Sequence, residues 1–268
     1  MALPPPTSDQ TVLITGASAG IGAELARQLA ERGHNVALVA RRAQRLRELA
    51  EQLRLRHGIH ADVEACDLTD ADARRDLVER LLAGERAVAG VCNNAGFGTV
   101  AVFHESELER EQQVVRLNVE AVHHLTGAFL PTMVERGAGA ILNVASIAAF
   151  QPLPGFATYA ASKAFVQSFS EAVHAELGGT GVSVTSLCPG FTHTEFGENA
   201  GAAEEEEAIP EFLFQEAPEV ARAGIEAMIA GRRTAIPGLH NRASMLGGRF
   251  VPRWLLLPVV RRVTAARR

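Results

Sequence analysis

Along most of the chain, short apolar runs alternate with longer segments in which apolar residues recur every three or four positions. Six of the short runs are predicted strands, at residues 11–15, 35–40, 61–67, 89–93, 139–145 and 182–187. The longer segments predict helices at residues 21–32, 43–57, 70–83, 105–136 and 158–177. The runs are too continuously apolar for half-solvated strands. This alternation of strands and helices is typical of a mostly parallel sheet with helices on both faces.

The pattern changes after residue 187. A long segment, about residues 191–217, contains an acidic run at 204–207 and then becomes apolar. A loop of this length in a compact domain is usually functional or disordered, so we expect it to help form the substrate site. A predicted helix at 218–230 and a strand at 234–236 precede a C-terminal extension at about 241–268. No linker divides the 268 residues, so we expect a single domain over residues 1–268.

Composition narrows the class of protein. The chain is 47% hydrophobic and 21% charged, with a formal net charge of −5, which argues against disorder and against general nucleic-acid binding. The three cysteines are far apart and form no CxxC pair, so we predict buried free thiols and no zinc site. No histidine pair has metal-ligand spacing, and no metal is expected. With no apolar run of membrane-span length and no leader-like start, the expected location is the cytoplasm.

A glycine-rich turn directly follows the first predicted strand and opens the first helix. The sequence Thr-Gly-Ala-Ser-Ala-Gly-Ile-Gly at 15–22 provides a tight turn, and free helix N–H groups then face a pyrophosphate. The candidate cofactor contacts in this turn are Gly16, Ser18, Gly20, Ile21 and Gly22.

Two arginines, Arg41 and Arg42, follow the second strand, where an acid would favour a free ribose 2′-hydroxyl. A guanidinium suits a 2′-phosphate, so NADP(H) is favoured over NAD(H). The alternative is that both arginines are a solvated pair at the start of the next helix.

The chain has a single tyrosine, Tyr159, and a single lysine, Lys163, although its other 25 basic residues are arginines. Four residues apart on a helix, the two side chains lie on one face. An incidental surface pair is the less favoured interpretation.

Taken together, these motifs resemble the short-chain dehydrogenase/reductase family. The resemblance covers about residues 8–195 and includes Asn-Asn-Ala-Gly at 93–96, Asn118, Ser146 and Pro189-Gly190. It implies a Rossmann-type, doubly wound parallel sheet of about seven strands and NAD(P)-dependent interconversion of carbonyls and alcohols.

The resemblance also implies roles for individual residues. Tyr159 would be the general acid or base, and Lys163 would bind the nicotinamide ribose and, with a nicotinamide cation, lower the pKa of the phenol. Ser146 would orient the substrate oxygen, and Asn118 would hold a water linking Lys163 to solvent. The further expected cofactor contacts are Asp67, Leu68, Asn94, Ala95, Gly96, Pro189, Gly190, Thr192 and Thr194.

We therefore expect an NADP(H)-dependent oxidoreductase that interconverts a ketone or aldehyde and an alcohol. Its expected substrate contacts are Ser146, Gln151, Tyr159 and Phe191. Aromatic residues favour an apolar substrate, with ordinary loop packing as the alternative; they are Phe150, Phe156, Phe191, Phe212 and Phe214. His193 is interpreted as a solvated loop residue rather than a substrate contact. The alternative function is a non-catalytic, NADP(H)-binding regulatory or scaffold protein.

Two expectations concern assembly. The helix at 158–177 is apolar on more than one face, which predicts a homodimer or homotetramer. The C-terminal tail mixes arginines with apolar residues. Its packing on the body or on a partner subunit is favoured over contact with a membrane surface.

Overall fold

A single parallel sheet organises the chain. The computed structural model describes residues 2–201, 209–255 and 257–258. Seven strands pair in the order β3-β2-β1-β4-β5-β6-β9, and every neighbouring pair is parallel. Their bounds are β1 Gln10–Thr15, β2 Asn35–Ala40, β3 Ala61–Ala65, β4 Ala87–Asn93, β5 Gly139–Val144, β6 Val182–Leu187 and β9 Thr234–Ala235. The strand order reverses between β1 and β4, which is where ligands bind in open sheets of this kind.

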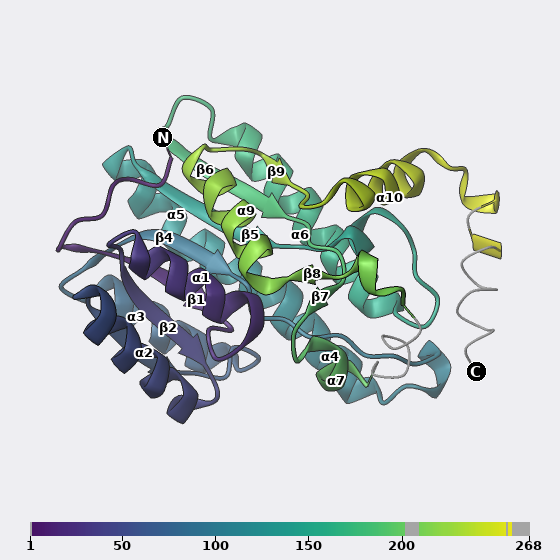
Figure 1. Ribbon diagram of the computed structural model, residues 1–268, viewed down its shortest axis with the longest axis horizontal. Helices are drawn as coiled ribbons and strands as arrows, with labels where there is room; N and C mark the ends of the chain where they lie inside the picture. Colours follow the sequence, from purple (N-terminus) through teal and green to yellow (C-terminus); the bar gives the residue numbers. More distant parts are fainter. Residues whose placement is uncertain (1, 202–208, 256, 259–268) are drawn as a thin grey trace.

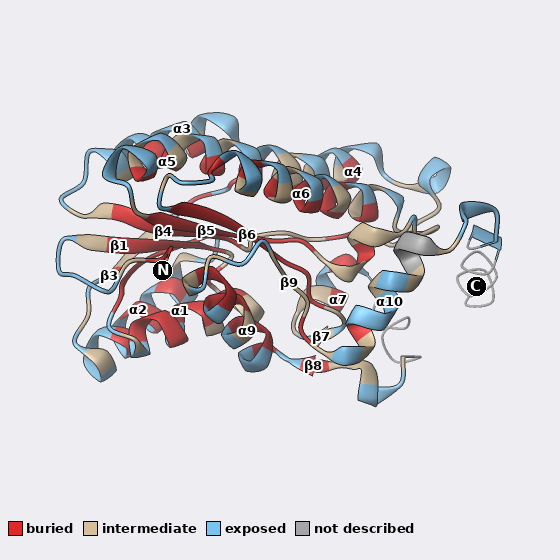
Figure 2. Cartoon of the chain, turned by 90° about the horizontal axis from the view of Figure 1, so that it is seen from above, coloured by how far each residue is buried: buried red, intermediate tan, exposed pale blue. Residues whose placement is uncertain are grey.

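Helices cover both faces of this sheet (Figures 1 and 2). One face carries α1 Gly20–Glu31, α2 Ala43–His57 and α9 Ala217–Ile229. The other carries α3 Ala71–Leu82, α4 Leu108–Val115, α5 Val122–Arg136 and α6 Ala157–Glu176. The predicted doubly wound Rossmann-type architecture is thereby confirmed.

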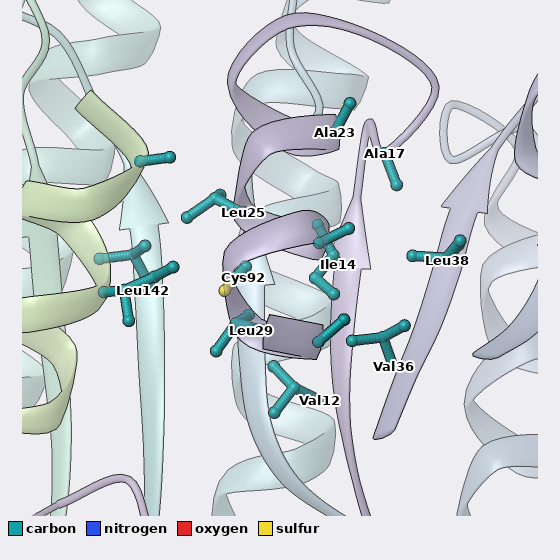
Figure 3. Packing of buried hydrophobic residues seen from close by; sticks show 14 of the residues in the cluster. Val12, Ile14, Ala17, Ala23, Leu25, Leu29, Val36, Leu38, Cys92 and Leu142 are labelled. Atoms are coloured by element: carbon teal, nitrogen blue, oxygen red, sulfur yellow. The ribbon is translucent and has the colours of Figure 1, made fainter. Parts of the chain in front are cut away.

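Apolar packing between the helices and the sheet forms the core. On the α1 side, Leu25 and Leu29 of α1 pack on Val12 and Ile14 of β1, with Leu142 of β5 beside them (Figure 3). The central strands are buried along nearly their whole length, as a parallel sheet covered on both faces requires. Strand β3 differs because it lies at the sheet edge, and only its first residue, Ala61, is fully buried.

A side-chain cap begins α3, and the expectation of buried free thiols is confirmed. Asp70 caps α3, since its carboxylate accepts hydrogen bonds from the backbone N–H groups of Asp72 and Ala73. The thiols of Cys66, Cys92 and Cys188 are buried and free. Among the described residues, no helix combines the length and the apolar character needed to cross a bilayer.

The expected continuous helix at 105–136 is divided. A 3-10 turn at Phe103–Glu105 precedes α4, and a π-helical segment at Arg116–Ala121 separates α4 from α5. Such segments insert one residue into the helical hydrogen-bond ladder and often occur at functional sites. Asn118 lies in the middle of this segment and is completely buried.

The region after β6 is more ordered than the sequence pattern indicates. Short strands β7 Thr192–His193 and β8 Gln215–Glu216 pair with each other, α7 spans Phe196–Ala200, and α10 spans Leu239–Phe250. The acidic run at 204–207 and the tail beyond residue 258 lie outside the described residues.

Candidate active site

A cavity of about 1280 Å³ lies at the carboxyl ends of the central strands. The sequence-predicted site residues line it, with two exceptions. Gly22 is buried beneath the glycine-rich turn, and Asn118 is buried behind the loop that follows β4. Segments from across the chain meet here because parallel strands end at the same edge of the sheet. The predicted residues on the cavity wall are Gly16, Ser18, Gly20, Ile21, Arg41, Arg42, Asp67, Leu68, Asn94, Ala95, Gly96, Ser146, Gln151, Tyr159, Lys163, Pro189, Gly190, Phe191, Thr192 and Thr194.

The glycine-rich turn forms one end of the cavity. Gly16 and Gly20 have φ values of +68° and +52°, which residues with a side chain rarely adopt. A Cβ atom on Gly22 would lie 2.3 Å from the carbonyl oxygen of Gly16, so only glycine allows this close packing of helix on strand. Within the described residues no side chain caps α1, and its first turn contains no acidic residue. Its N-terminal N–H groups therefore remain available to an anion, and the turn fits the pyrophosphate of a dinucleotide.

Arginines line the cavity wall next to this turn. Arg42 donates from Nε and Nη2 to Ser18 Oγ at 3.1 and 3.0 Å. The side chain of Arg41 is exposed and has no hydrogen bond or ion pair within the described part of the chain. The sequence interpretation found no acid near these arginines. The structure brings one from the loop after β6, since Glu195 Oε2 lies 2.7 Å from Arg42 Nη1.

The middle of the cavity is formed by Ser146, after β5, and by Tyr159, in the first turn of α6. The Tyr159 ring packs against Phe156 and Phe196, with centroid separations of 6.4 and 5.3 Å. Gly98 leaves room for this ring, because a Cβ there would lie 3.2 Å from Tyr159 Cδ2. Ser146 forms a hydrogen bond with the phenol, and Ser146 Oγ also accepts from the N–H of Ala148 at 3.1 Å.

Lys163 lies one helical turn after Tyr159. Its side chain is 5% exposed, and Nζ donates to the Val144 carbonyl oxygen at 2.8 Å. The Nζ atom is 5.8 Å from the centroid of the Tyr159 ring. The helix spacing and the end of β5 thus place an ammonium beside the phenol.

Burial dominates the titration of both groups. It raises the pKa of Tyr159 to about 12, against the opposing effect of the hydrogen bond from Ser146. It lowers the pKa of Lys163 to about 8, against the attraction of the neighbouring Cys188 thiol. The phenol is therefore protonated at neutral pH, as a proton donor to a carbonyl oxygen must be. The expected lowering of the phenol pKa by Lys163 and a nicotinamide cation stays a prediction.

Asn118 connects the wall of the cavity to α6. Its Nδ2 donates to the Phe97 carbonyl oxygen at 2.9 Å and to Ser162 Oγ at 3.0 Å, and its Oδ1 accepts from the Phe97 N–H at 3.2 Å. Ser162 in turn donates to the carbonyl oxygen of Tyr159 at 2.7 Å. The amide side chain therefore holds the Phe97 loop against the helix that carries the tyrosine and the lysine.

The far end of the cavity is mostly apolar, and only some of the aromatic residues that the sequence singles out line it. Phe156 and Phe191 line it, whereas Phe212 is 77% exposed. Phe150 packs in a small core cluster, and Phe214 packs on Phe191 and on the ring of His193. Several further lining residues belong to no motif that the sequence singles out, and most of them lie in loops, short turns or the first turn of a helix: Phe97, Val100, Val102, Phe103, Arg110, Leu153, Glu195, Phe196, Ile209 and Leu213.

Other predicted residues occupy supporting positions. Asp67 Oδ1 accepts from the backbone and side chain of Thr69 at 2.9 and 2.8 Å, so it also fixes its own turn. A Cβ atom on Gly20 would lie 2.9 Å from Thr194 Cγ2, which shows how closely the loop after β6 approaches the glycine-rich turn. His193 is outside the cavity lining, 3.1 Å from Glu211 Oε1.

Comparison with known proteins agrees with this geometry. The family model of the short chain dehydrogenases matches residues 10–205. The chain belongs to the short-chain dehydrogenase/reductase family. It is an NAD(P)-dependent oxidoreductase of the class that acts on alcohol and carbonyl groups.

Related proteins extend this assignment to most of the chain. Sulfoacetaldehyde reductase 2 of Chromohalobacter salexigens is 40% identical over 187 residues, which cover 69% of this chain and 73% of that protein. A short-chain dehydrogenase from Sphingobium yanoikuyae, solved in complex with NADPH, has a TM-score of 0.81 and 34% identity, covering 96% of this chain and 95% of that one. The bulky-bulky ketone specific alcohol dehydrogenase of Comamonas testosteroni has a TM-score of 0.77 and 30% identity, with coverages of 97% and 95%.

The buried lysine of this short-chain dehydrogenase predicts a pH dependence of stability. The pKa of Lys163 is about 8 in the folded protein, and its ordinary value, expected in the unfolded chain, is 10.5. Between pH 8 and pH 10.5 the unfolded chain therefore binds more protons than the folded protein. The free energy of unfolding therefore rises as the pH increases through this interval. Urea denaturation should be measured for wild type and for Lys163→Met, which lacks the titrating group. Between pH 7 and 9.5 the unfolding free energy of wild type should rise by about 1–2 kcal/mol relative to that of Lys163→Met. A flat or falling difference would contradict the lowered pKa.

Proposed function

We propose that this enzyme uses NADPH to reduce the carbonyl group of an apolar ketone, or catalyses the reverse oxidation. The observation that carries the proposal is one continuous cavity. It joins the glycine-rich turn and the arginines at one end, Ser146, Tyr159 and Lys163 in the middle, and apolar side chains at the other. The NADPH complex of the Sphingobium relative supports the choice of cofactor.

The proposed chemistry follows from where the polar groups lie. When bound, NADPH supplies the hydride that adds to the carbonyl carbon. Ser146 Oγ binds the carbonyl oxygen, and the protonated phenol of Tyr159 donates its proton to that oxygen. The Lys163 ammonium and the Ser146 hydroxyl then stabilise the phenolate that remains. Lys163 also binds the ribose hydroxyls, and Asn118 holds the loop that faces it.

The apolar lining of the far end supports a bulky apolar substrate. Phe103, Phe156, Phe191, Leu153 and Leu213 surround this part of the cavity. The Comamonas alcohol dehydrogenase is described as specific for bulky-bulky ketones, and its fold and length match this chain. Gln151 is the proposed polar contact at this end.

One observation favours a second substrate class. Arg110 of α4 lines the cavity with its guanidinium 4.3 Å above the Phe97 ring, and it has no ion pair within the described residues. Its Nη2 donates to the carbonyl oxygen of Asn199 at 3.2 Å, and a guanidinium without a carboxylate partner in an apolar wall suits an anionic group. The 40% identical relative named sulfoacetaldehyde reductase makes a small aldehyde with an acidic group the second candidate.

A non-catalytic, NADP(H)-binding scaffold remains the alternative, and the joint presence of Ser146, Tyr159 and Lys163 on one cavity wall argues against it. We also propose a cytoplasmic enzyme without nucleic-acid partners, folded as one domain over residues 1–268. In it, the described parts of the loop at 191–217 border the substrate, and the described part of the extension at 241–268 packs on the body or on a partner subunit rather than on a membrane.

Turnover of a carbonyl panel tests the proposed function. NADPH oxidation should be fastest with bulky apolar ketones, slower with small acidic aldehydes, and reduced at least a hundredfold in Tyr159→Phe and Lys163→Arg. Arginine is a planar fork and cannot replace the compact ammonium. Circular dichroism should show that both variants fold, and cofactor titration should show that Tyr159→Phe still binds NADPH. Near-wild-type rates in folded Lys163→Arg would contradict the proposed role of the lysine.

A preference for acidic aldehydes that is lost in Arg110→Met would favour the second substrate class.

Cofactor choice gives a separate prediction. Arg41 is free to contact a 2′-phosphate, and loss of a charge-assisted contact costs about 1.5–3 kcal/mol. Fluorescence titration should therefore show NADPH binding at least tenfold weaker in Arg41→Ala, with NADH binding unchanged. Arg47→Ala removes another exposed arginine of α2, outside the cavity, and is the matched control. Equal affinity of the wild type for NADPH and NADH would reject the preference.

We propose that the outer faces of α4 and α6 form the subunit interface of a homodimer or homotetramer. Val115 and Phe165 are each 39% exposed there, and Phe165 stacks on Phe169. Light scattering at micromolar concentration should give a mass of at least twice 28.6 kDa. Phe165→Glu should shift it toward the single-chain mass, whereas Leu55→Glu, on exposed α2 surface, should not. A wild type of 28.6 kDa would reject assembly.

A further inference from the structure

Glu195 occupies an unusual position for an acidic residue in this site. It follows β7, precedes α7, and reaches the start of α2, whose residues are about 150 positions earlier in the chain. Its Oε2 atom lies 2.7 Å from Arg42 Nη1, and its Oε1 atom lies 2.5 Å from Arg45 Nη1. One carboxylate therefore bridges two guanidinium groups.

This carboxylate lies at the end of the cavity proposed to hold the cofactor 2′-phosphate. Arg42, Ser18 and Glu195 all line it, and Arg42 is held between Ser18 Oγ and the carboxylate. The hydrogen bonds from Arg42 and Arg45 hold the pKa of Glu195 below its ordinary value, so the group is anionic at neutral pH. A 2′-phosphate on Arg42 would meet this negative charge and would have to share the guanidinium with it.

We propose that Glu195 is a specificity-determining residue that competes with the 2′-phosphate of NADP(H) for Arg42. The competition lowers the preference for NADP(H) over NAD(H), because only the phosphorylated cofactor meets the carboxylate. The inference rests on the cofactor site of the proposed function. Arg41, which makes no such pair with any residue that the structure describes, is then the arginine that receives the phosphate without displacing another anion.

The local structure does not require the negative charge. Glu195 is the N-cap residue of α7, but its side chain makes no capping hydrogen bond. Its main-chain carbonyl oxygen accepts from Asn199 N at 3.1 Å and from Asn199 Nδ2 at 2.6 Å, and these bonds persist in any substitution that keeps the backbone. Glu195→Gln therefore removes the charge and retains the shape of the loop.

The size of the expected change in NADPH affinity follows from how far the three charged side chains are exposed to solvent. The side chains of Glu195, Arg42 and Arg45 are 36%, 44% and 48% exposed, so solvent screens their attraction. We therefore expect a moderate effect, about three- to tenfold in affinity, which decreases as salt is added.

Cofactor titration of wild type, Glu195→Gln and Glu198→Gln tests the proposal. Glu198 is an exposed acid on the same helix with no ion pair among the described residues, and it is the matched control. At low ionic strength, NADPH should bind Glu195→Gln about three- to tenfold more tightly than wild type, with NADH unchanged within about twofold. Glu198→Gln should change the affinity for neither NADPH nor NADH. Two fragments without the nicotinamide should give the same result. Adenosine 2′,5′-bisphosphate, which carries the 2′-phosphate, should bind Glu195→Gln more tightly than wild type, and AMP, which lacks it, should bind both equally.

The outcomes separate this proposal from the proposed function. Unchanged or weaker NADPH binding, or an equal change for both cofactors, would overturn the competition and leave Glu195 as a structural tie between the loop and α2. A wild type that prefers NADH would overturn the proposed cofactor preference, yet a selective gain for NADPH in Glu195→Gln would still support the competition. If neither dinucleotide binds, the proposed function fails, and the bisphosphate titration then decides on Glu195.

Discussion

The site depends on how closely the turn after β1 approaches the loop after β4. Thr15 Oγ1 accepts from the N–H groups of Asn94 and Ala95 at 2.9 and 3.0 Å, and Asn94 Nδ2 donates to the Thr15 carbonyl oxygen at 3.0 Å. A Cβ atom on Gly16 would lie 2.8 Å from Asn94 Nδ2, so any side chain there would separate the two segments. Their contact closes the floor of the cavity and leaves the first N–H groups of α1 facing into it.

A second set of buried polar contacts fixes α6, the helix that carries Tyr159 and Lys163. Asn143 of β5 accepts from Asn93 Nδ2 at 2.9 Å and donates to Ser170 Oγ of α6 at 2.9 Å. Buried amides of this kind cost free energy unless they are paired, so the network specifies one alignment of α6 on the sheet. That alignment places Tyr159 beside Ser146 and carries Lys163 to the end of β5. The same arrangement lowers the stability of the fold, because it removes the Lys163 ammonium from water.

Local sequence information was sufficient for most of the fold and for placing Tyr159 and Lys163 on one face of a helix that lines the cavity. The strands at 35–40 and 182–187 and the helix at 43–57 have the predicted bounds, because apolar periodicity is a property of adjacent residues. The spacing of Tyr159 and Lys163 is likewise local. The π-helical segment at Arg116–Ala121 was missed because it leaves no distinctive pattern in the sequence. Helix α10 was also missed, although Leu239, Ala243 and Leu246 recur in it at helical spacing. The aromatic lining was only partly predicted, since composition does not tell which faces of a loop point inward.

The charged residues at the cofactor end of the cavity show most clearly what local sequence information leaves out. Arg41 and Arg42 follow β2, and a local interpretation of that segment finds cations and no acid. Folding adds Glu195, which approaches because the loop after β6 lies against the glycine-rich turn, where Thr194 faces Gly20. The proposed reaction thus relies on residues four positions apart on one helix. The proposed balance between the two cofactors instead relies on a contact across about 150 residues, and such a contact is visible only when the chain is folded.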